Sequence, residues 1–281
     1  MKIKFWGTRG SIAVPGKDTT VYGGNTTCLE IMPESGKKII IDAGTGIRPL
    51  GDHLVADMED VDVYLLLTHV HWDHVWGFPF FAPLYMPSTT VRVDGFHTCM
   101  KGLQATFDTK MGDGFFPVKF EDLKADIQYL EVLKHGSLTI AGMTIDKVPL
   151  QHPQGGFGFR FREGGKTLVF MTDNELTDEA WAGRHPGDYV EFCRDADILI
   201  HDGQYKPEEI GQRKGWGHSD YEAALDLAAR AGVRELVLFH HDPARTDVEL
   251  TAIISRCGDL VSERGLPCNV SAAKEGAELI L

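Results

Sequence analysis

Residues 65–74 read Leu65-Leu66-Leu67-Thr68-His69-Val70-His71-Trp72-Asp73-His74, an apolar run that ends in three histidines and an aspartate. Together with Val63 and Tyr64, the leucines predict a strand that is buried on both faces and delivers these polar residues to its carboxyl end. Charged groups directly after a buried strand are costly unless they have partners. A plain cluster of surface histidines is therefore the weaker interpretation, and the segment predicts a binding site at the rim of a sheet.

The spacing within the cluster indicates metal binding. If the chain stays extended after the strand, His69 and His71 point to the same side and can share one ion. A tight turn then brings Asp73 and His74 round to a second ion. Imidazole nitrogen and carboxylate oxygen are the ligands expected for zinc, and they also suit manganese or iron.

Composition limits the possible partners. The chain has 281 residues, 43% of them hydrophobic, and no linker or shift in composition divides it, so we expect one domain spanning residues 1–281. The 28 Lys and Arg residues against 41 Asp and Glu residues give a net charge of −13, a field that repels nucleic-acid phosphates at long range. A large nucleic acid is therefore an unlikely partner, whereas a homodimer remains open.

The sequence predicts a cytoplasmic location. The N-terminus alternates polar and apolar residues like a first strand, without the apolar core of an export signal, and no run of 18 or more apolar residues predicts a membrane span. The five cysteines are scattered and form no C-x-x-C pair, which makes a disulfide framework or a cysteine zinc site a poor fit: Cys28, Cys99, Cys193, Cys257 and Cys268.

Asp42 ends an earlier predicted strand. Residues 2–6, 26–32 and 37–42 are expected to be strands, and the last is followed by Ala43-Gly44-Thr45-Gly46. An acid in this place can orient a histidine ligand from behind. Alternatively, Asp42 caps a helix that starts near Ile47.

Four more candidates follow later strands or precede a helix. His152 comes after a run of antiparallel strands expected from Ile127 to Pro149, and can give His69 and His71 a third protein ligand that leaves one position open. Asp173 ends the second strand of a hairpin around Gly164-Gly165, where it can bridge two cations or merely cap the next helix.

His218 stands before a helix predicted from Tyr221 to Ala231, where backbone N–H groups favour an anion such as phosphate; alternatively, it only packs on Trp216. His240 directly follows the strand 235–239 and is preferred to His241 as a metal ligand. The pair His201-Asp202 ends another strand and either supports the site or fixes a loop.

Other segments are expected to surround the predicted site rather than to provide metal ligands. Residues 76–83 are too aromatic and too broken by prolines for a long helix and are expected to wall the pocket. A helix is predicted over 97–107, within a flap insertion around 97–126. Phe115-Phe116 either belong to a mobile flap over the site or pack under a surface loop. A helix from Asp247 to about Arg264 and a strand near Glu278 close the fold.

The candidates sort into two ion sites. His69, His71 and His152 make one, Asp73, His74 and His240 make the other, and Asp173 lies between them. Mostly neutral ligands would leave a strongly positive dinuclear centre that activates water and clamps an anionic substrate.

The order and spacing of these residues resemble the metallo-β-lactamase superfamily. The segments that carry the resemblance, besides the H-x-H-x-D-H motif, are Phe5-Trp6-Gly7-Thr8-Arg9-Gly10-Ser11, Gly23-Gly24-Asn25-Thr26, Asp42-Ala43-Gly44-Thr45-Gly46, Phe115-Phe116-Pro117-Val118, Gly217-His218-Ser219 and Phe239-His240-His241-Asp242-Pro243. They look like the bacterial branch related to cyclic-nucleotide phosphodiesterases and tRNA 3′-processing ribonucleases. The resemblance implies an α/β fold, a four-layer αββα sandwich with mixed sheets and helices outside.

The resemblance also implies a reaction. A hydroxide bridging two metal ions would attack phosphorus, Asp73 would hold a metal and orient the nucleophile, and His218 would stabilise charged oxygens or protonate the leaving group. The long, basic, glycine-rich arm with which tRNA-processing relatives grip tRNA has no counterpart here. Together with the net charge of −13, this favours a phosphodiesterase for a small or cyclic nucleotide.

Two further functions stay open. The first is another hydrolase of the same fold, acting on an ester, a lactone or an RNA 3′-end. The second is a metal-binding or redox module without hydrolysis, which would predict iron, visible colour and a partner flavin domain.

Overall fold

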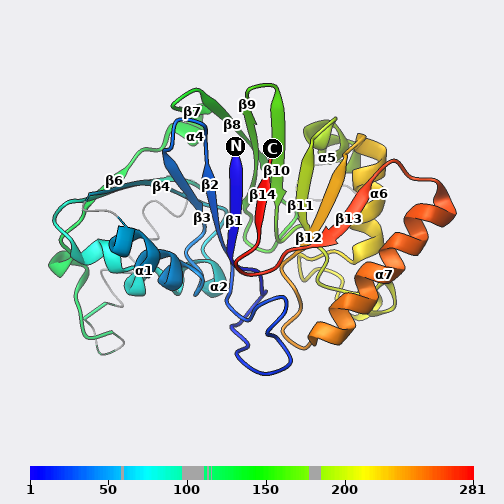
Figure 1. Ribbon diagram of the computed structural model, residues 1–281, viewed down its shortest axis with the longest axis horizontal. Coiled ribbons are helices and arrows are strands. Elements are labelled where there is room, and N and C mark those ends of the chain that lie inside the picture. The colour runs from blue at the N-terminus through cyan, green and yellow to red at the C-terminus, as the bar shows by residue number, and fades with distance from the viewer. Residues whose placement is uncertain (58–59, 97–110, 113, 115, 177–184) are drawn as a thin grey trace.

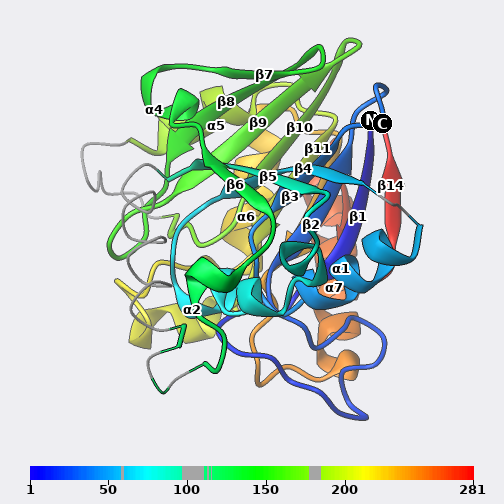
Figure 2. The same cartoon turned by 90° about the vertical axis from the view of Figure 1, so that its left-hand side faces the viewer.

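Two seven-stranded sheets form the centre of the computed structural model, which describes residues 1–57, 60–96, 111–112, 114, 116–176 and 185–281. In spatial order, the first sheet contains β14 (Glu278–Ile280), β1 (Lys2–Gly7), β2 (Cys28–Met32), β3 (Lys38–Ile41), β4 (Val61–Leu67), β5 (Thr89–Gly95) and β6 (Asp126–Tyr129). The second contains β13 (Asn269–Ala272), β12 (Glu235–Phe239), β11 (Ile198–Asp202), β10 (Lys166–Met171), β9 (Phe157–Glu163), β8 (Met143–Pro149) and β7 (Leu138–Ile140). Figure 2 shows β14 at one edge of the first sheet, beside β1.

Helices cover the outer faces of both sheets (Figure 1). The α-helices are α1 (Ile47–Asp57), α2 (Trp72–Val75), α4 (Val132–His135), α5 (Pro186–Cys193), α6 (Tyr221–Ala231) and α7 (Asp247–Arg264). Short 3₁₀ turns are η1 (Phe78–Phe80), η2 (Ala82–Tyr85), η3 (Phe120–Asp122) and η4 (Pro207–Gln212). Among the residues with described placement, no helix combines the length and the apolar character that crossing a bilayer requires.

Within the described part of the chain, three apolar clusters hold the layers together. The central cluster lies between the sheets and includes Phe5 of β1 and Phe170 of β10. A second packs α5, α6 and α7 on the outer face of the second sheet, and a third packs α1 on the outer face of the first. Because each sheet is covered on both faces, the second half of β4 is apolar and buried throughout, as Leu65, Leu66 and Leu67 show. These layers confirm the predicted αββα sandwich.

Caps explain why the two long helices of the second half begin and end where the sequence predicts. The side chain of Asp220 accepts hydrogen bonds from the second and third amides of α6, and Thr246 accepts one at the start of α7. Such caps are each worth about 1 kcal/mol. Gly232 and Gly265 end the helices in the left-handed conformation, with φ of 70° and 61°.

The prediction of antiparallel strands over 127–149 is wrong for the first of these strands. β6 pairs parallel with β5 at the edge of the first sheet, whereas β7 and β8 form an antiparallel hairpin in the second. The chain crosses between the sheets by way of α4, whose first two amides donate to the buried carboxylate of Asp94. Alternation of side chains is the same in parallel and antiparallel strands, so it does not predict the pairing partner.

Most of the segment expected to hold a helix and a flap lies outside the described residues. This applies to residues 97–110, including Cys99, and to Phe115. Phe116 is half-buried, and its ring meets that of Phe80 edge-on at 5.3 Å between centroids. Phe116 thus packs against the edge of the third apolar cluster.

Candidate metal centre

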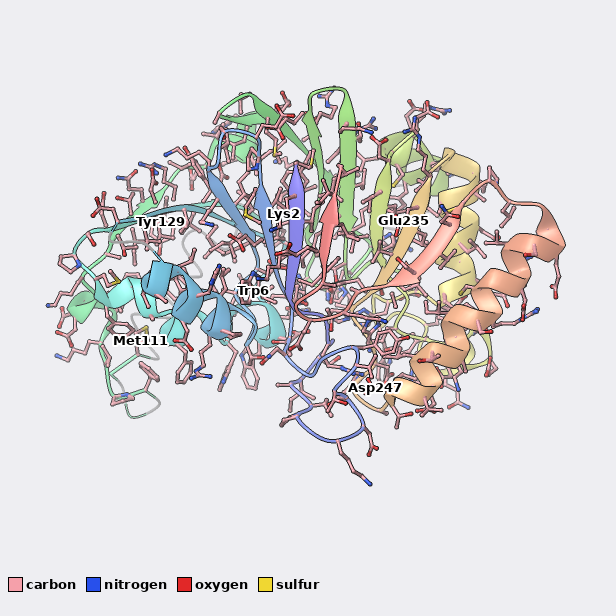
Figure 3. The ribbon with its side chains drawn as sticks, viewed as in Figure 1. Lys2, Trp6, Met111, Tyr129, Glu235 and Asp247 are labelled. Atoms are coloured by element: carbon pink, nitrogen blue, oxygen red, sulfur yellow. The ribbon has the colours of Figure 1, made fainter. Side chains whose placement is uncertain are left out.

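The predicted site residues follow strands whose carboxyl ends lie at one edge of the sandwich. β3 and β4 are parallel in the first sheet, and β10, β11 and β12 are parallel in the second. β8 runs in the same direction as β10, because both pair antiparallel with β9. Figure 3 shows β1 running from Lys2 towards Trp6 and the end of the molecule where α2 lies. The convergence of loops at this end follows from the strand directions.

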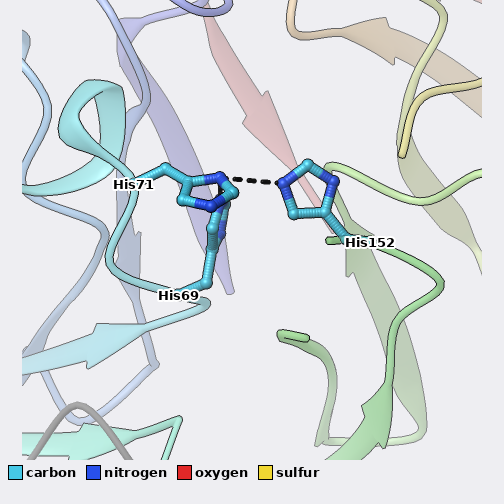
Figure 4. Close-up of side chains that lie close together, drawn as sticks. All are labelled: His69, His71 and His152. Atoms are coloured by element: carbon cyan, nitrogen blue, oxygen red, sulfur yellow. Dashed lines mark hydrogen bonds between the residues drawn. The ribbon is translucent and has the colours of Figure 1, made fainter. Parts of the chain in front are cut away.

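His69, His71 and His152 come together and are called the histidine group below. His71 Nδ1 lies 3.1 Å from His69 Nε2 and 2.9 Å from His152 Nε2. Figure 4 shows the three rings facing one another from the loops after β4 and β8. One ligand atom from each lies within 4.8 Å of the others, which suits a single ion bound by three imidazoles.

Neutral groups orient all three imidazoles from behind. His69 Nδ1 is 3.1 Å from the Thr68 hydroxyl, and His71 Nε2 is 3.0 Å from Gln154 Oε1. His152 Nδ1 donates to the carbonyl oxygen of Gly217 at 3.0 Å. Gly217 has a φ of 87°, and a Cβ there would lie 2.0 Å from His152 Nδ1, so glycine is required at this contact. The opposite nitrogens are left to face the centre.

Asp73, His74, Asp173 and His240 form a second set, the carboxylate group. His240 Nε2 lies 3.1 Å from Asp73 Oδ2, and both imidazoles lie 3.3–3.4 Å from Asp173 Oδ2. α2 provides Asp73 and His74, so the tight turn expected there is a short helix. His74 Nε2 is buried and has no hydrogen-bond partner among the residues that the structure describes. A buried ring nitrogen that faces two carboxylates in this way fits a divalent cation between them.

Asp173 joins the two groups through its two oxygens. Oδ1 lies 3.8 Å from His69 Nε2 and from His152 Nε2, whereas Oδ2 faces His74 and His240. Its backbone φ is 54°, in a region that non-glycine residues rarely adopt. The next described helix, α5, begins only at Pro186 and takes His185 as its N-cap. Asp173 therefore does not cap that helix.

Asp42 lies directly behind the carboxylate group. Its Oδ2 is 2.8 Å from His74 Nδ1, and the carboxylate also accepts hydrogen bonds from the amide and hydroxyl of Thr68 at 2.8 and 2.7 Å. The amide of Ile47, at the start of α1, donates to the Gly44 carbonyl instead. This is the arrangement expected of an acid that orients a histidine ligand.

Gln204 orients His240, which is a role that the sequence analysis did not assign. Its Oε1 lies 2.8 Å from His240 Nδ1 and leaves Nε2 to face Asp73. The neighbouring His241 points elsewhere: its Nε2 donates to the Ala273 carbonyl oxygen at 2.9 Å, and burial lowers its pKa to about 3. The structure thus places His240, and not His241, among the carboxylates.

The pKa of His74 shifts in the opposite direction to the pKa values of His69 and His152. Burial lowers the pKa of His152 to about 4, and burial together with His74 lowers that of His69 well below its usual value. Burial alone would also lower the pKa of His74, but Asp173, Asp73 and Asp42 outweigh it and raise that pKa well above its usual value. The imidazoles in turn hold the pKa values of Asp73 and Asp173 well below the usual range, against the effect of burial. The carboxylates are therefore ionised at neutral pH, the form that binds metal.

His218 lies between the two groups. Its ring stacks on that of His240 at 5.0 Å and meets that of His152 edge-on at 5.2 Å. His218 Nδ1 is 3.3 Å from Asp202 Oδ2, which also accepts the amide hydrogen of Ser219. Both of the roles left open for Asp202 are therefore combined: it contacts a site histidine and fixes the loop that carries it.

Glu175 holds the same loop from the other side, and the sequence analysis did not identify it. Its carboxylate accepts hydrogen bonds from the amides of Gly215 and Gly217, each at 2.9 Å. Because Gly217 also accepts from His152, Glu175 links the histidine group to the segment before α6. The side chain lies only a few residues after β10, but nothing in the local sequence distinguishes it from a surface acid.

Buried Arg9 fixes the loop after β1. Its guanidinium donates to the carbonyl oxygens of Gly23, Asp242 and Arg245. Further along this loop, the amide of Ser11 donates to Asp73 Oδ2 at 2.7 Å. The loop thereby closes one side of the carboxylate group.

Both groups open into one cavity of about 510 Å³. Its lining consists of Ser11, Val70, His71, Trp72, Asp73, His152, Pro153, Gln154, Asp173, Trp216 and His218. The prediction that residues 76–83 wall this pocket is wrong for Trp76, Gly77 and Phe80, which line a second cavity of about 390 Å³ instead. Trp76 follows α2 directly, but it lines a different cavity from Asp73 of that helix.

Comparisons with known proteins support the resemblance to the metallo-β-lactamase superfamily. The model of the family described as "Beta-lactamase superfamily domain" matches residues 37–241, more than half of the chain. Ribonuclease Z of Enterococcus faecalis is 24% identical over 85% of this chain and 86% of its own length. Ribonuclease Z of Thermoplasma acidophilum is 24% identical over 89% of each.

Solved structures share the fold over the full chain. The metallo-β-lactamase fold protein YhfI from Bacillus subtilis has a TM-score of 0.72 at 19% identity, covering 99% of this chain and 98% of its own. A diphosphatase from the PhnP family has a TM-score of 0.67 at 17% identity, covering 100% and 97%. The short form of human tRNase Z has a TM-score of 0.66 at 17% identity, covering 100% and 99%. The chain belongs to the metallo-β-lactamase superfamily, as the H-x-H-x-D-H motif predicts.

Proposed function

We propose that the protein is a metal-dependent hydrolase that cleaves the phosphodiester bond of a small or cyclic nucleotide. One observation carries the proposal: the histidine group, the carboxylate group and His218 open into the same cavity, with Asp173 between the two groups. We assign one divalent cation to each group, zinc first and manganese or iron as alternatives. Bound there, such cations would activate water and neutralise the oxygens of a phosphodiester.

The residues of the chain would divide the remaining work. His218 lines the cavity and is held by Asp202, so it is positioned to stabilise the charged oxygens or to protonate the leaving group. Asp73 also lines the cavity, and the Ser11 amide fixes one of its oxygens. Asp73 would hold a cation and orient the attacking water.

The size of the substrate is inferred from charge. A net charge of −13 opposes long-range attraction of a polynucleotide, which favours a small nucleotide. The specific observation in favour of a second candidate, cleavage at an RNA 3′-end, is the similarity to ribonuclease Z over 85% of the chain. The scattered cysteines predict that either reaction takes place in the cytoplasm.

Metal analysis followed by a substrate panel tests the proposal. Purified protein should contain two ions per chain and hydrolyse bis(p-nitrophenyl) phosphate and small nucleotides, with no turnover of lactones or β-lactams. Preference for a precursor tRNA over every small nucleotide would select the second candidate. Lactone hydrolysis without phosphodiester hydrolysis would contradict both.

A further inference from the structure

Large aromatic side chains are exposed beside the metal cavity. Trp72, Trp76 and Phe80 are 73%, 55% and 50% exposed, and we call them the aromatic strip. The rings of Trp72 and Trp76 lie 5.2 Å apart between centroids, tilted by 47°. Exposed aromatic side chains that cluster in this way mark binding surfaces, because they add nothing to the stability of the folded chain while they face solvent.

The strip is a direct continuation of the metal centre. α2 carries Asp73 and His74 towards the ions, while Trp72 and Trp76, four positions apart, share its outer side. Trp72 lines the metal cavity, and Trp76 lines the second cavity. The paired indoles therefore link the lining of one cavity to the lining of the other.

The second cavity has the chemistry of a nucleotide subsite. Its volume of about 390 Å³ lies within the roughly 300–1,000 Å³ of small-molecule pockets. The lining combines Trp76 and Phe80 with one ionisable residue, Arg48. The Arg48 guanidinium is 3.5 Å from Asp52, but both side chains are more than half exposed, so this ion pair is weak and leaves the cation available.

The other polar groups of this cavity are already engaged. Asn25 donates to Glu275, and the Thr45 hydroxyl donates to Asn25 Oδ1. What the cavity offers a ligand is thus two aromatic faces and one guanidinium. Flat bases stack on such faces with little regard to sequence, and a phosphate is the natural partner of the guanidinium.

We propose that the substrate is a short single-stranded oligonucleotide whose scissile phosphodiester lies at the metal centre while its next bases stack on the aromatic strip. The phosphate that follows lies at Arg48. This inference rests on the proposed phosphodiesterase function and names the substrate class of the same site. A single cyclic nucleotide would occupy the metal cavity and leave the second cavity without a role. The net charge of −13 disfavours a longer chain, whose distant phosphates would meet an acidic surface.

Substitution of Trp76 tests the inference in the metal-loaded protein. One readout is the ratio of kcat/KM for trithymidylate to that for methyl p-nitrophenyl phosphate, which is too short to reach the second cavity. Trp76→Ala should lower this ratio about 5- to 100-fold, since each stacked base contributes in that range, and Trp76→Phe should restore most of it. The matched control is Val248→Ala on α7, an exposed apolar residue at 79% exposure, which should leave the ratio unchanged.

A binding measurement separates this inference from the proposed function. Fluorescence anisotropy with a labelled phosphorothioate trithymidylate, which is hydrolysed slowly, should show a Kd raised about 5- to 100-fold by Trp76→Ala. If the wild-type protein hydrolyses no phosphodiester but this loss of binding is seen, the proposed function fails and the nucleotide subsite stands. Equal affinity of wild type and Trp76→Ala would overturn the subsite. So would sedimentation showing that the wild type is a dimer and that Trp76→Ala is monomeric, because the strip would then be a subunit interface.

Discussion

The histidine group and the carboxylate group share one cavity, yet the surrounding protein orients them in different ways. Thr68, Gln154 and a backbone carbonyl, all neutral, orient the three imidazoles of the first group. In the second group, the neutral Gln204 stands behind His240, but the buried carboxylate of Asp42 stands behind His74. A charged partner makes a ligand more basic and holds it more firmly than a neutral one. We therefore expect an ion in the carboxylate group to bind more tightly than an ion in the histidine group.

The largest effect is expected from removing a ligand of the histidine group. His71 provides the atom that lies nearest to both His69 and His152, so His71→Ala should release the ion of the histidine group and reduce hydrolysis below detection. Metal analysis of the dialysed variant should show one ion per chain. Retention of two ions would mean that His71 is not a ligand.

A smaller effect is expected at the residue between the groups. His218 stacks on His240 and meets His152 edge-on, without belonging to either predicted ligand triad. His218→Ala should keep both ions and slow phosphodiester cleavage by roughly 10²–10⁴, the range of a positioned acid or base. The metal content and kcat of the same preparation provide the two readouts. An unchanged kcat would remove His218 from the mechanism.

The residues that orient the ligands provide a further test of the difference between the two groups. Asp42→Asn replaces a buried charge with a neutral group and should weaken the binding of the ion in the carboxylate group about 10- to 100-fold. Gln154→Ala removes a neutral, exposed partner of His71 and should weaken the other ion by less than about 10-fold. Competition with a fluorescent chelator measures both affinities. Equal losses would show that charge behind a ligand does not distinguish the groups.

The smallest expected effect is the number of protons that the protein releases when it binds a metal ion. Because the acidic neighbours raise the pKa of His74, this imidazole is protonated at pH 7 in the metal-free protein and must lose its proton when it binds an ion. The lowered pKa values of His69 and His152 mean that these residues are already neutral at that pH. Calorimetry in buffers of different ionisation enthalpy should therefore detect the proton that His74 releases, with none coming from His69 and His152. Release of no proton would contradict the raised pKa of His74.

Much of the site could be predicted because its residues follow buried strands. Each apolar run identifies a strand, and a polar residue at its end is placed at the rim without knowledge of the whole fold. The strand 235–239 before His240 and the helix Tyr221–Ala231 after His218 have the predicted bounds. Strong local signals determine both elements, namely the four apolar residues that follow Glu235 in the strand and the capped amphipathic pattern of the helix.

Other features depend on contacts that the local sequence does not encode. The pairing of β6 with β5 requires the chain to change sheets, and side-chain alternation is silent on that point. Gln204 and Glu175 act through partners that are distant in sequence, and each would pass for an ordinary loop residue. The short α5 and β13 are not predicted, because eight and four residues are too few to show a clear period.

The most direct measurement is a crystal structure of the metal-loaded protein with anomalous diffraction at the absorption edge of the bound metal. Two anomalous peaks about 3.5–4 Å apart are expected, one among His69, His71 and His152 and one among Asp73, His74 and His240, with Asp173 reaching both. A single peak, or peaks away from these side chains, would contradict the account.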